Sequence, residues 1–143
     1  MSKDPKNPNG ALILRTLAMP ADTNANGDIF GGWILSQMDL AAGILARDAT
    51  ASRAVTVAMD GVKFIKPVKV GDVVCCYGDV IKIGRTSVTL KIETWVNPKL
   101  RNIIKPEPRF KVTEASFTFV AIDEDHNKKA IDLPDTARIG STN

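Results

Sequence analysis

The chain has 143 residues and a mass of 15.5 kDa, which is the size of one ordinary domain. Apolar residues make up 44% of the sequence and charged residues 24%, a balance that excludes disordered and fibrous proteins. The net charge of +3 is too small to indicate a nucleic-acid-binding protein, although it suits an anionic small molecule such as a phosphorylated cofactor.

No segment has the character of a membrane-spanning helix or of a secretory signal. The longest dense apolar run, 33–46, is interrupted by Ser36, Gln37 and Asp39 and falls short of the roughly 18 apolar residues that a span needs. Residues 1–10 carry charges and prolines but no apolar core. We therefore expect a single cytoplasmic domain over residues 1–143, without membrane insertion.

The pattern predicts one strand, then a long helix, then three or four long antiparallel strands. Residues 1–9 indicate a loose leader, and the charged tail over about 123–143 indicates weak structure. Gly84 and Arg85 have the character of a tight turn. The predicted elements are a strand over 11–19, a turn-rich stretch over 21–28, a helix over about 31–50, strands over 53–64, 73–83, 86–96 and 110–122, and a proline-containing loop over 97–109.

Two features of this pattern predict how the elements pack. In the strand over 86–96 apolar residues alternate with others, and Glu93 and Trp95 fall on the face expected to be wet. The helix has almost no polar face, so something must wrap it, and only the sheet is available. We therefore expect an α+β fold in which an antiparallel sheet curls around a buried central helix.

The two cysteines, Cys75 and Cys76, are adjacent in the chain. In a strand their side chains point to opposite faces, so they pair poorly in a disulfide. With only one histidine to help, they do not make a zinc cage. We expect no metal site and treat both cysteines as small buried apolar residues.

Asp39 stands among apolar residues of the predicted helix. Its neighbours one turn away, Leu35, Ala42 and Gly43, cannot pair with a charge, and a buried carboxylate without a partner is costly. The sharper interpretation is a general base or nucleophile in a water-poor cleft. The plainer one is that Asp39 lies on a solvent or subunit rim, or bonds to a backbone amide.

The segment that leads into the helix ends in a glycine pair, Gly31 and Gly32. Glycines at a helix start let a ligand approach the free backbone amides, which carry the positive end of the helix dipole. Such a place can hold a phosphate or a developing oxyanion. The alternative is that Asp28 caps the helix and the glycines only allow tight packing.

The sequence lacks the motifs of the common hydrolase machineries. The only histidine, His126, lies in a charged stretch that we expect to be a solvated turn, so a Ser-His-Asp or Cys-His site has no base. There is no G-x-S-x-G elbow, no Walker loop and no dinucleotide fingerprint. Any chemistry must therefore depend on a carboxylate, amides and backbone dipoles.

Basic residues near one aromatic side chain are a second candidate binding feature. Lys63, Lys66 and Lys69 lie beside Phe64 and Pro67 in the sequence. With Arg85 these lysines could meet the phosphates of a ligand. Ordinary solvated surface is the alternative for these lysines.

Six segments carry a resemblance to a known family. They read RTLAMP at 15–20, DTNANGDIFGGW at 22–33, SQMD at 36–39, FIKP at 64–67, VGDVVCCY at 70–77 and GRTS at 84–87. Together they resemble the bacterial acyl-CoA thioesterases of the hotdog fold, of the YciA type, over about residues 11–122. Where related members often carry an asparagine and a histidine, this chain has Asp28 and Phe30.

The resemblance implies a hotdog fold and hydrolysis of acyl-CoA to coenzyme A and a free carboxylic acid. Coenzyme A is then part of the substrate, and no separate cofactor is implied. The family's acidic catalytic residue falls on Asp39, its loop asparagine on Asn24 and its glycine pair on Gly31 and Gly32. The residues expected to contact the substrate are Lys63, Phe64, Lys66, Gly84, Arg85, Thr86 and Ser87.

Helix geometry predicts that the site is shared between two chains. Gly31 and Asp39 are eight residues apart, about 12 Å along a helix, so one thioester cannot lie within about 3 Å of both. In a two-fold dimer the start of one helix can face the middle of the other. We therefore expect a homodimer with composite sites, and the resemblance extends this to a trimer of dimers.

Two other functions stay open at this point. A hotdog dehydratase acts on similar thioesters but usually places a histidine in its active site. A non-catalytic sensor of acyl-CoA or nucleotides would keep the cleft and the basic residues without needing Asp39.

Overall fold

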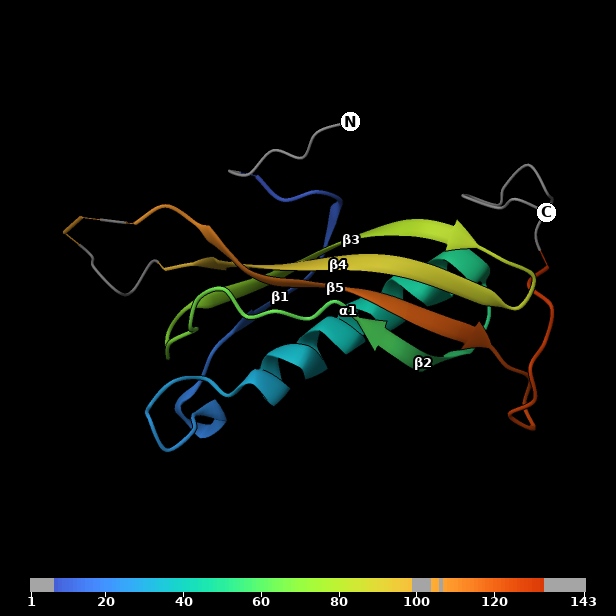
Figure 1. The fold of residues 1–143 in the computed structure, drawn as a ribbon, viewed down its shortest axis with the longest axis horizontal. Coiled ribbons are helices and arrows are strands. Elements are labelled where there is room, and N and C mark those ends of the chain that lie inside the picture. Colours follow the sequence, from blue (N-terminus) through green and yellow to red (C-terminus); the bar gives the residue numbers. More distant parts are fainter. Residues whose placement is uncertain (1–6, 99–103, 106, 133–143) are drawn as a thin grey trace.

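The computed structural model describes residues 7–98, 104–105 and 107–132 (Figure 1). The elements in those ranges are β1 (Ala11–Leu17), the short 3-10 helix η1 (Pro20–Asp22), α1 (Gly31–Thr50), β2 (Ala54–Asp60), β3 (Val73–Ile83), β4 (Ser87–Asn97) and β5 (Phe110–Ala121). The helix has the predicted bounds, and most strands begin and end within two residues of the predicted positions. The described residues contain no helix that is both long and apolar enough to cross a membrane.

All five strands form one antiparallel sheet in the order β1-β3-β4-β5-β2. β3 and β4 are joined by the predicted tight turn, in which the Gly84 amide donates to the Ser87 carbonyl at 2.7 Å. β1 and β2 are the two edges of the sheet. The predicted combination of an antiparallel sheet and one long central helix is confirmed.

α1 lies across one face of the sheet and packs on it through small residues (Figure 1). Ala41, Ala42 and Ala46 are fully buried. Alanine side chains let the helix backbone come close to the strands, where Gly78 makes room in the same way. A β-carbon at Gly78 would lie 3.0 Å from the Cδ2 of Leu45 on α1. This close approach fixes the rotation of α1 and therefore which of its residues face away from the sheet.

The sheet curls around the helix, which contacts all five strands, and leaves one side of the helix uncovered. The uncovered side of α1 exposes 56% of Leu40 and 45% of Ile44. The edge strand β2 exposes Val55, which lines the same hollow as Leu40 and Ile44, and it also exposes Val57. A monomer rarely leaves so many large apolar side chains together in water, so this surface suits a partner chain.

The outer face of the sheet is more buried than the alternation of residues in β4 predicts. Glu93 and Trp95 are only 1% and 3% exposed, although they fall on the face expected to be wet. The Trp95 indole nitrogen donates to Glu93 Oε1 at 2.9 Å, and Asn9 Nδ2 donates to Glu93 Oε2 at 2.9 Å. Asn9, from the predicted loose leader, therefore covers this carboxylate, which alternation within one strand cannot reveal. Residues 1–6 of that leader lie outside the described residues.

The described part of the predicted weak tail packs against the sheet. Asp123 Oδ1 accepts hydrogen bonds from the backbone amides of Asp125 and Asn127, each at 2.9 Å, and so closes a turn. Ile131 is 1% exposed and joins the core, and its amide donates to the Arg85 carbonyl at 2.7 Å. One buried isoleucine thus anchors this segment. The remainder of the predicted tail, 133–143, lies outside the described residues.

Both cysteines are free and buried in β3, as the sequence predicts. Burial raises the pKa of the Cys76 thiol to about 11, against the opposing effect of a hydrogen bond with Thr94. The thiol is therefore protonated at neutral pH and is a poor nucleophile.

We expect Glu93→Ala to lower the free energy of unfolding by about 1–3 kcal/mol, because it leaves the buried indole N–H of Trp95 without its acceptor. Glu93→Gln keeps one side-chain oxygen and should lose less. Denaturant titration followed by circular dichroism measures both variants. A Glu93→Ala protein as stable as the wild type would show that the hydrogen bond from Trp95 to Glu93 does not stabilise the fold.

We expect iodoacetamide at pH 8 to modify Cys76 about 100-fold more slowly than an unperturbed thiol, because a raised pKa lowers the thiolate fraction. Mass spectrometry of timed samples measures the rate at each cysteine. The control is the same protein in denaturant, where both thiols should react freely. Rapid modification of Cys76 in the folded protein would show that the thiol is not protected.

Candidate functional site

The loop before α1 is shaped by the side chain of Asn24. Its Oδ1 accepts hydrogen bonds from the backbone amides of Asn26 at 2.9 Å and of Asp28 at 3.2 Å. Gly27 completes the turn with a φ of 83°, a conformation that favours glycine. Because Oδ1 is occupied within the loop, the Nδ2 group is the part of Asn24 left to meet a ligand.

The start of α1 presents backbone amides that are not used within the chain. Phe30 is the N-cap residue and makes no side-chain cap. Among the described residues, the amides of Gly31 and Gly32 have no hydrogen-bond partner. Asp28, the alternative cap, instead pairs with Lys69 Nζ at 2.9 Å. The helix start is therefore open to an anionic atom.

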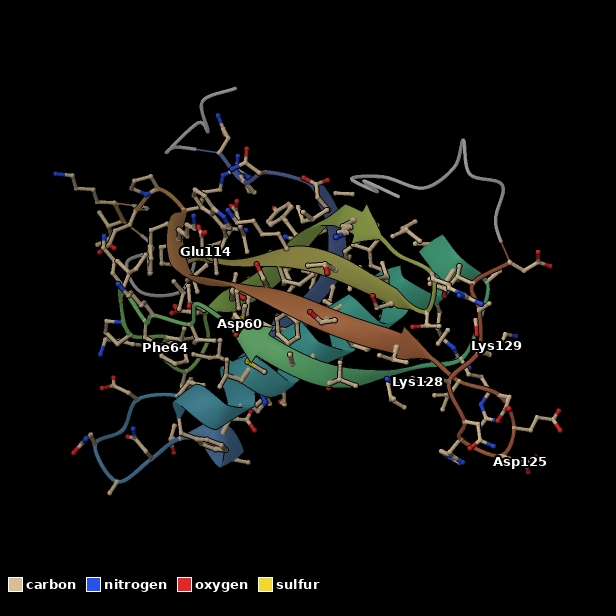
Figure 2. The ribbon with its side chains drawn as sticks, turned by 45° about the vertical axis from the view of Figure 1, so that its right-hand side comes forward. Asp60, Phe64, Glu114, Asp125, Lys128 and Lys129 are labelled. Atoms are coloured by element: carbon tan, nitrogen blue, oxygen red, sulfur yellow. The ribbon has the colours of Figure 1, made fainter. Side chains whose placement is uncertain are left out.

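The ring of Phe64 lies against Gly31 at the start of α1. A β-carbon at Gly31 would lie 3.1 Å from the Cζ of Phe64, tighter than ordinary contact. Phe64 comes from the segment after β2 (Figure 2). The aromatic ring thus covers one side of the helix start and leaves the other side accessible.

Asp39 lies in the middle of α1 and is half-buried. Its neighbours on the helix suggested that the carboxylate has no partner. The structure gives it one, because Thr56 Oγ1 donates to Asp39 Oδ1 at 2.6 Å. Thr56 belongs to the edge strand β2. The hydroxyl holds one carboxylate oxygen in place and leaves the other free to act on a substrate.

Sequence reasoning missed Thr56 because it considered only residues on the same helix face as Asp39. Which strand lies beside the middle of α1 depends on the strand order, and that order is not visible in a local pattern. One signal was available, since Thr56 is the polar residue in the apolar run Ala54-Val-Thr-Val-Ala58.

Two separate hollows contain three of the four predicted catalytic residues, and Gly32 lines neither of them. We call the first the Asp39 hollow; it has a volume of about 520 Å³ and is lined by Asp39, Thr56, Leu40, Ile44, Val55 and Phe119, among others. We call the second the loop hollow; it has a volume of about 320 Å³ and is lined by Asn24, Gly31, Phe64, Lys66, Ile34 and Ile65, among others. The two hollows share no lining residue, so a single chain does not bring Asp39 to the helix start.

The predicted substrate-contacting residues are divided between two ends of the sheet. Phe64 and Lys66 line the loop hollow, near the start of α1. Residues 84–87 form the β3–β4 turn at the end where α1 finishes (Figure 1). Lys63 is exposed and lines neither hollow. One chain therefore does not present Lys66 and Arg85 to the same phosphate.

His126 lies in an exposed turn, as the sequence predicts, with a φ of 66°. It also lines the end of the Asp39 hollow, which no local signal indicates. Within the described ranges, no group of three or more His, Cys, Asp or Glu residues is placed to hold a metal ion.

The chain is similar to known proteins over most of its length. The family described as the thioesterase superfamily matches residues 26–100. The acyl-CoA thioester hydrolase YciA of Escherichia coli is 52% identical over 127 residues, which cover 87% of this chain and 92% of that protein.

Two solved structures are similar in both fold and sequence. The hexameric thioesterase of Yersinia pestis has a TM-score of 0.83 at 53% identity, and the match covers 89% of this chain and 100% of that one. The hexameric hotdog-fold thioesterase of Campylobacter jejuni has a TM-score of 0.80 at 41% identity, covering 86% of this chain and 91% of that one.

Proposed function

This chain belongs to the thioesterase superfamily, and we propose that it is an acyl-CoA thioester hydrolase that splits acyl-CoA into coenzyme A and a free carboxylic acid. One observation carries the proposal to the level of residues. Asp39 lines a hollow of mixed polar and apolar residues, and Thr56 holds one of its carboxylate oxygens, which leaves the other oxygen available to a substrate. A carboxylate in that setting is suited to acid–base or nucleophilic work.

Asp39 has two routes to the products. As a general base it takes a proton from water, whose oxygen attacks the thioester carbon; the C–S bond then breaks and the sulfur leaves as the thiol with that proton. As a nucleophile it attacks the carbon itself, releases the thiolate and forms an anhydride that water then hydrolyses. Incorporation of oxygen-18 from water into Asp39 during a single turnover occurs only on the nucleophilic route.

The start of α1 supplies the stabilisation of charge. During attack the carbonyl oxygen becomes an oxyanion, and the unpaired amides of Gly31 and Gly32 can donate to it at the positive end of the helix. The Nδ2 group of Asn24 is a further donor, because Oδ1 already holds the loop. These donors and Asp39 must act on one carbonyl carbon.

A two-fold dimer brings these groups together. The Asp39 hollow of one chain would meet the loop hollow of its partner, with the exposed side chains of Leu40, Ile44, Val55 and Val57 buried between them. The surface left uncovered on α1 and β2 supports this arrangement. Since similar thioesterases of known structure are hexameric, we propose that three such dimers assemble into a homohexamer.

The two rival functions make different demands on the residues. A dehydratase of this fold would need a histidine, and His126 lies in an exposed turn at the end of the Asp39 hollow. A sensor would bind acyl-CoA without turnover. Incubating the protein with acyl-CoAs of several chain lengths and measuring free thiol separates hydrolysis from both rivals, because only a hydrolase releases coenzyme A.

We expect Asp39→Asn to reduce thioester hydrolysis by at least about 100-fold, the usual scale for a positioned acid–base group. Thr56→Val removes one hydrogen bond to Asp39 and should cost about tenfold. Thr56→Ser, which keeps the hydroxyl, is the matched control and should recover most of that loss. Near-normal turnover by a folded Asp39→Asn protein would remove Asp39 from the mechanism.

We expect two inactive variants to complement each other if the site is composite. Asn24→Asp keeps the Oδ1 acceptor of the loop but loses the Nδ2 donor, and Asp39→Ala removes the carboxylate. After mixing, partial unfolding and reassembly, about half of the dimers are mixed and each has one intact site, so activity should recover to about a quarter of the wild type. Each variant reassembled alone is the control. A site built within one chain would show no recovery.

A further inference from the structure

The loop before α1 is a small hairpin that carries Asn24 near its tip. Thr23 and Ile29 pair across it as an antiparallel bridge, and the Asn24 amide donates to the Asp28 carbonyl at 2.7 Å. Asn24 and the three residues after it are exposed, so packing does little to fix their positions. The position of the Asn24 side chain therefore depends on how the hairpin is tied to the rest of the chain.

Two ties come from the segment between β2 and β3. The Ile29 amide donates to the Val68 carbonyl at 2.9 Å, toward the base of the hairpin. Lys69 Nζ forms an ion pair with Asp28 Oδ1 at 2.9 Å, one residue closer to the tip. The ion pair thus holds the hairpin one step nearer to Asn24 than the backbone hydrogen bond does.

The backbone of Lys69 is itself well anchored. Its amide donates to Asp72 Oδ2 at 2.9 Å, and the Asp72 amide donates back to the Lys69 carbonyl at 3.1 Å. Asp72 is fully buried, and its carbonyl accepts a hydrogen bond at 3.0 Å from the amide of Ala18, directly after β1. Lys69 therefore extends from a fixed turn, so its ammonium group can restrain the carboxylate that it binds.

Asp28 connects the ion pair to Asn24 through its backbone. The Asp28 amide donates to Asn24 Oδ1 at 3.2 Å, and the Asp28 carbonyl accepts the Asn24 amide. Asp28 and Asn24 both line the loop hollow, whereas Lys69 does not. Lys69 can therefore act on Asn24 through Asp28 without touching a substrate that lies in the hollow.

The other charged groups near the hairpin have different partners. Asp22 Oδ2 accepts a hydrogen bond at 3.3 Å from a backbone amide three residues earlier in the chain. Lys66, which lines the loop hollow, has its Nζ 4.9 Å from the centroid of an aromatic ring of β5. Within the described part of the chain, Lys69 and Asp28 are therefore each other's charged partner. Their side chains remain 51% and 33% exposed, so the pair is a modest tie and not a rigid clamp.

We propose that Lys69 is a positioning residue for the hydrolysis. By holding Asp28, it keeps Asn24 Nδ2 directed toward the place where the thioester oxygen becomes an oxyanion. This inference rests on the proposed function. A donor stabilises a transition state best when its position is fixed before the reaction, so loosening the hairpin lowers the rate more than it lowers the affinity for substrate.

The test compares Lys69→Met with the wild type on hexanoyl-CoA and hexanoyl-pantetheine. We expect kcat to fall about threefold for both substrates with KM unchanged, because the lost ion pair is an exposed one. Lys69→Arg keeps the charge and the hydrogen bond and should restore the rate. Adding Asp28→Asn to Lys69→Met should cost little more, since the carboxylate has already lost its partner. Lys82→Met, at an exposed lysine of β3 outside both hollows, is the matched control.

Hydrogen exchange followed by mass spectrometry measures the hold on the hairpin without turnover. Peptides covering 22–30 should exchange about threefold faster in Lys69→Met than in the wild type, and Lys82→Met should leave them unchanged. This readout separates a loosened hairpin from a direct effect on the substrate.

Three results would overturn the proposal. A KM raised only for hexanoyl-CoA would mean that Lys69 meets the phosphates directly. Faster exchange with an unchanged kcat would mean that catalysis does not use the order of the hairpin. Unchanged exchange would mean that Lys69 does not hold the hairpin. Failure of the proposed function looks different, because a wild type that releases no thiol contradicts hydrolysis whatever the exchange rates are.

Discussion

The close approach of α1 to the sheet determines where every functional group lies. Ala41, Ala42 and Ala46 face the strands with no exposed surface, so the helix cannot rotate without separating close-packed atoms. This fixes Asp39 on the flank of the helix, half-buried and beside β2. The same contact leaves Leu40 and Ile44 on the far side, where the chain itself offers nothing to cover them.

The chemistry is divided along the length of one helix. The first turn offers unpaired amides and the positive end of the dipole, the middle offers a carboxylate, and the last turn offers Arg47. In the proposed mechanism, positive groups thus flank the carboxylate of Asp39, and the oxyanion forms at the positive end of a helix.

Local sequence patterns predicted the elements well because helix and strand periods and turn residues act over short distances. The helix over 31–50 and the strand over 73–83 agree with the structure at both ends. The patterns could not predict contacts made across the sheet, such as Thr56 with Asp39 or Asn9 with Glu93. Each of those contacts joins residues that only the strand order brings together.

The candidate site was predicted unevenly for the same reason. Asn24, Gly31 and Gly32 lie in one continuous segment, so their grouping near the helix start follows from chain connectivity. Lys66 and Arg85 lie at opposite ends of the sheet. Their separation follows from how the strands are arranged, which the spacing of residues along the sequence does not reveal. The division of the site between two hollows did follow from the sequence, because the rise of a helix is a fixed length.

The uncovered edge strand β2 affects how readily a newly synthesised chain aggregates before it assembles. β2 pairs with β5 on one side only, and Val55 and Val57 are exposed along it, which makes it a template for pairing with any other extended chain. Covering this edge with a second copy protects the chain from aggregation. In a composite-site enzyme the same step completes catalysis, so the unassembled copies that are most prone to aggregate are also the inactive ones.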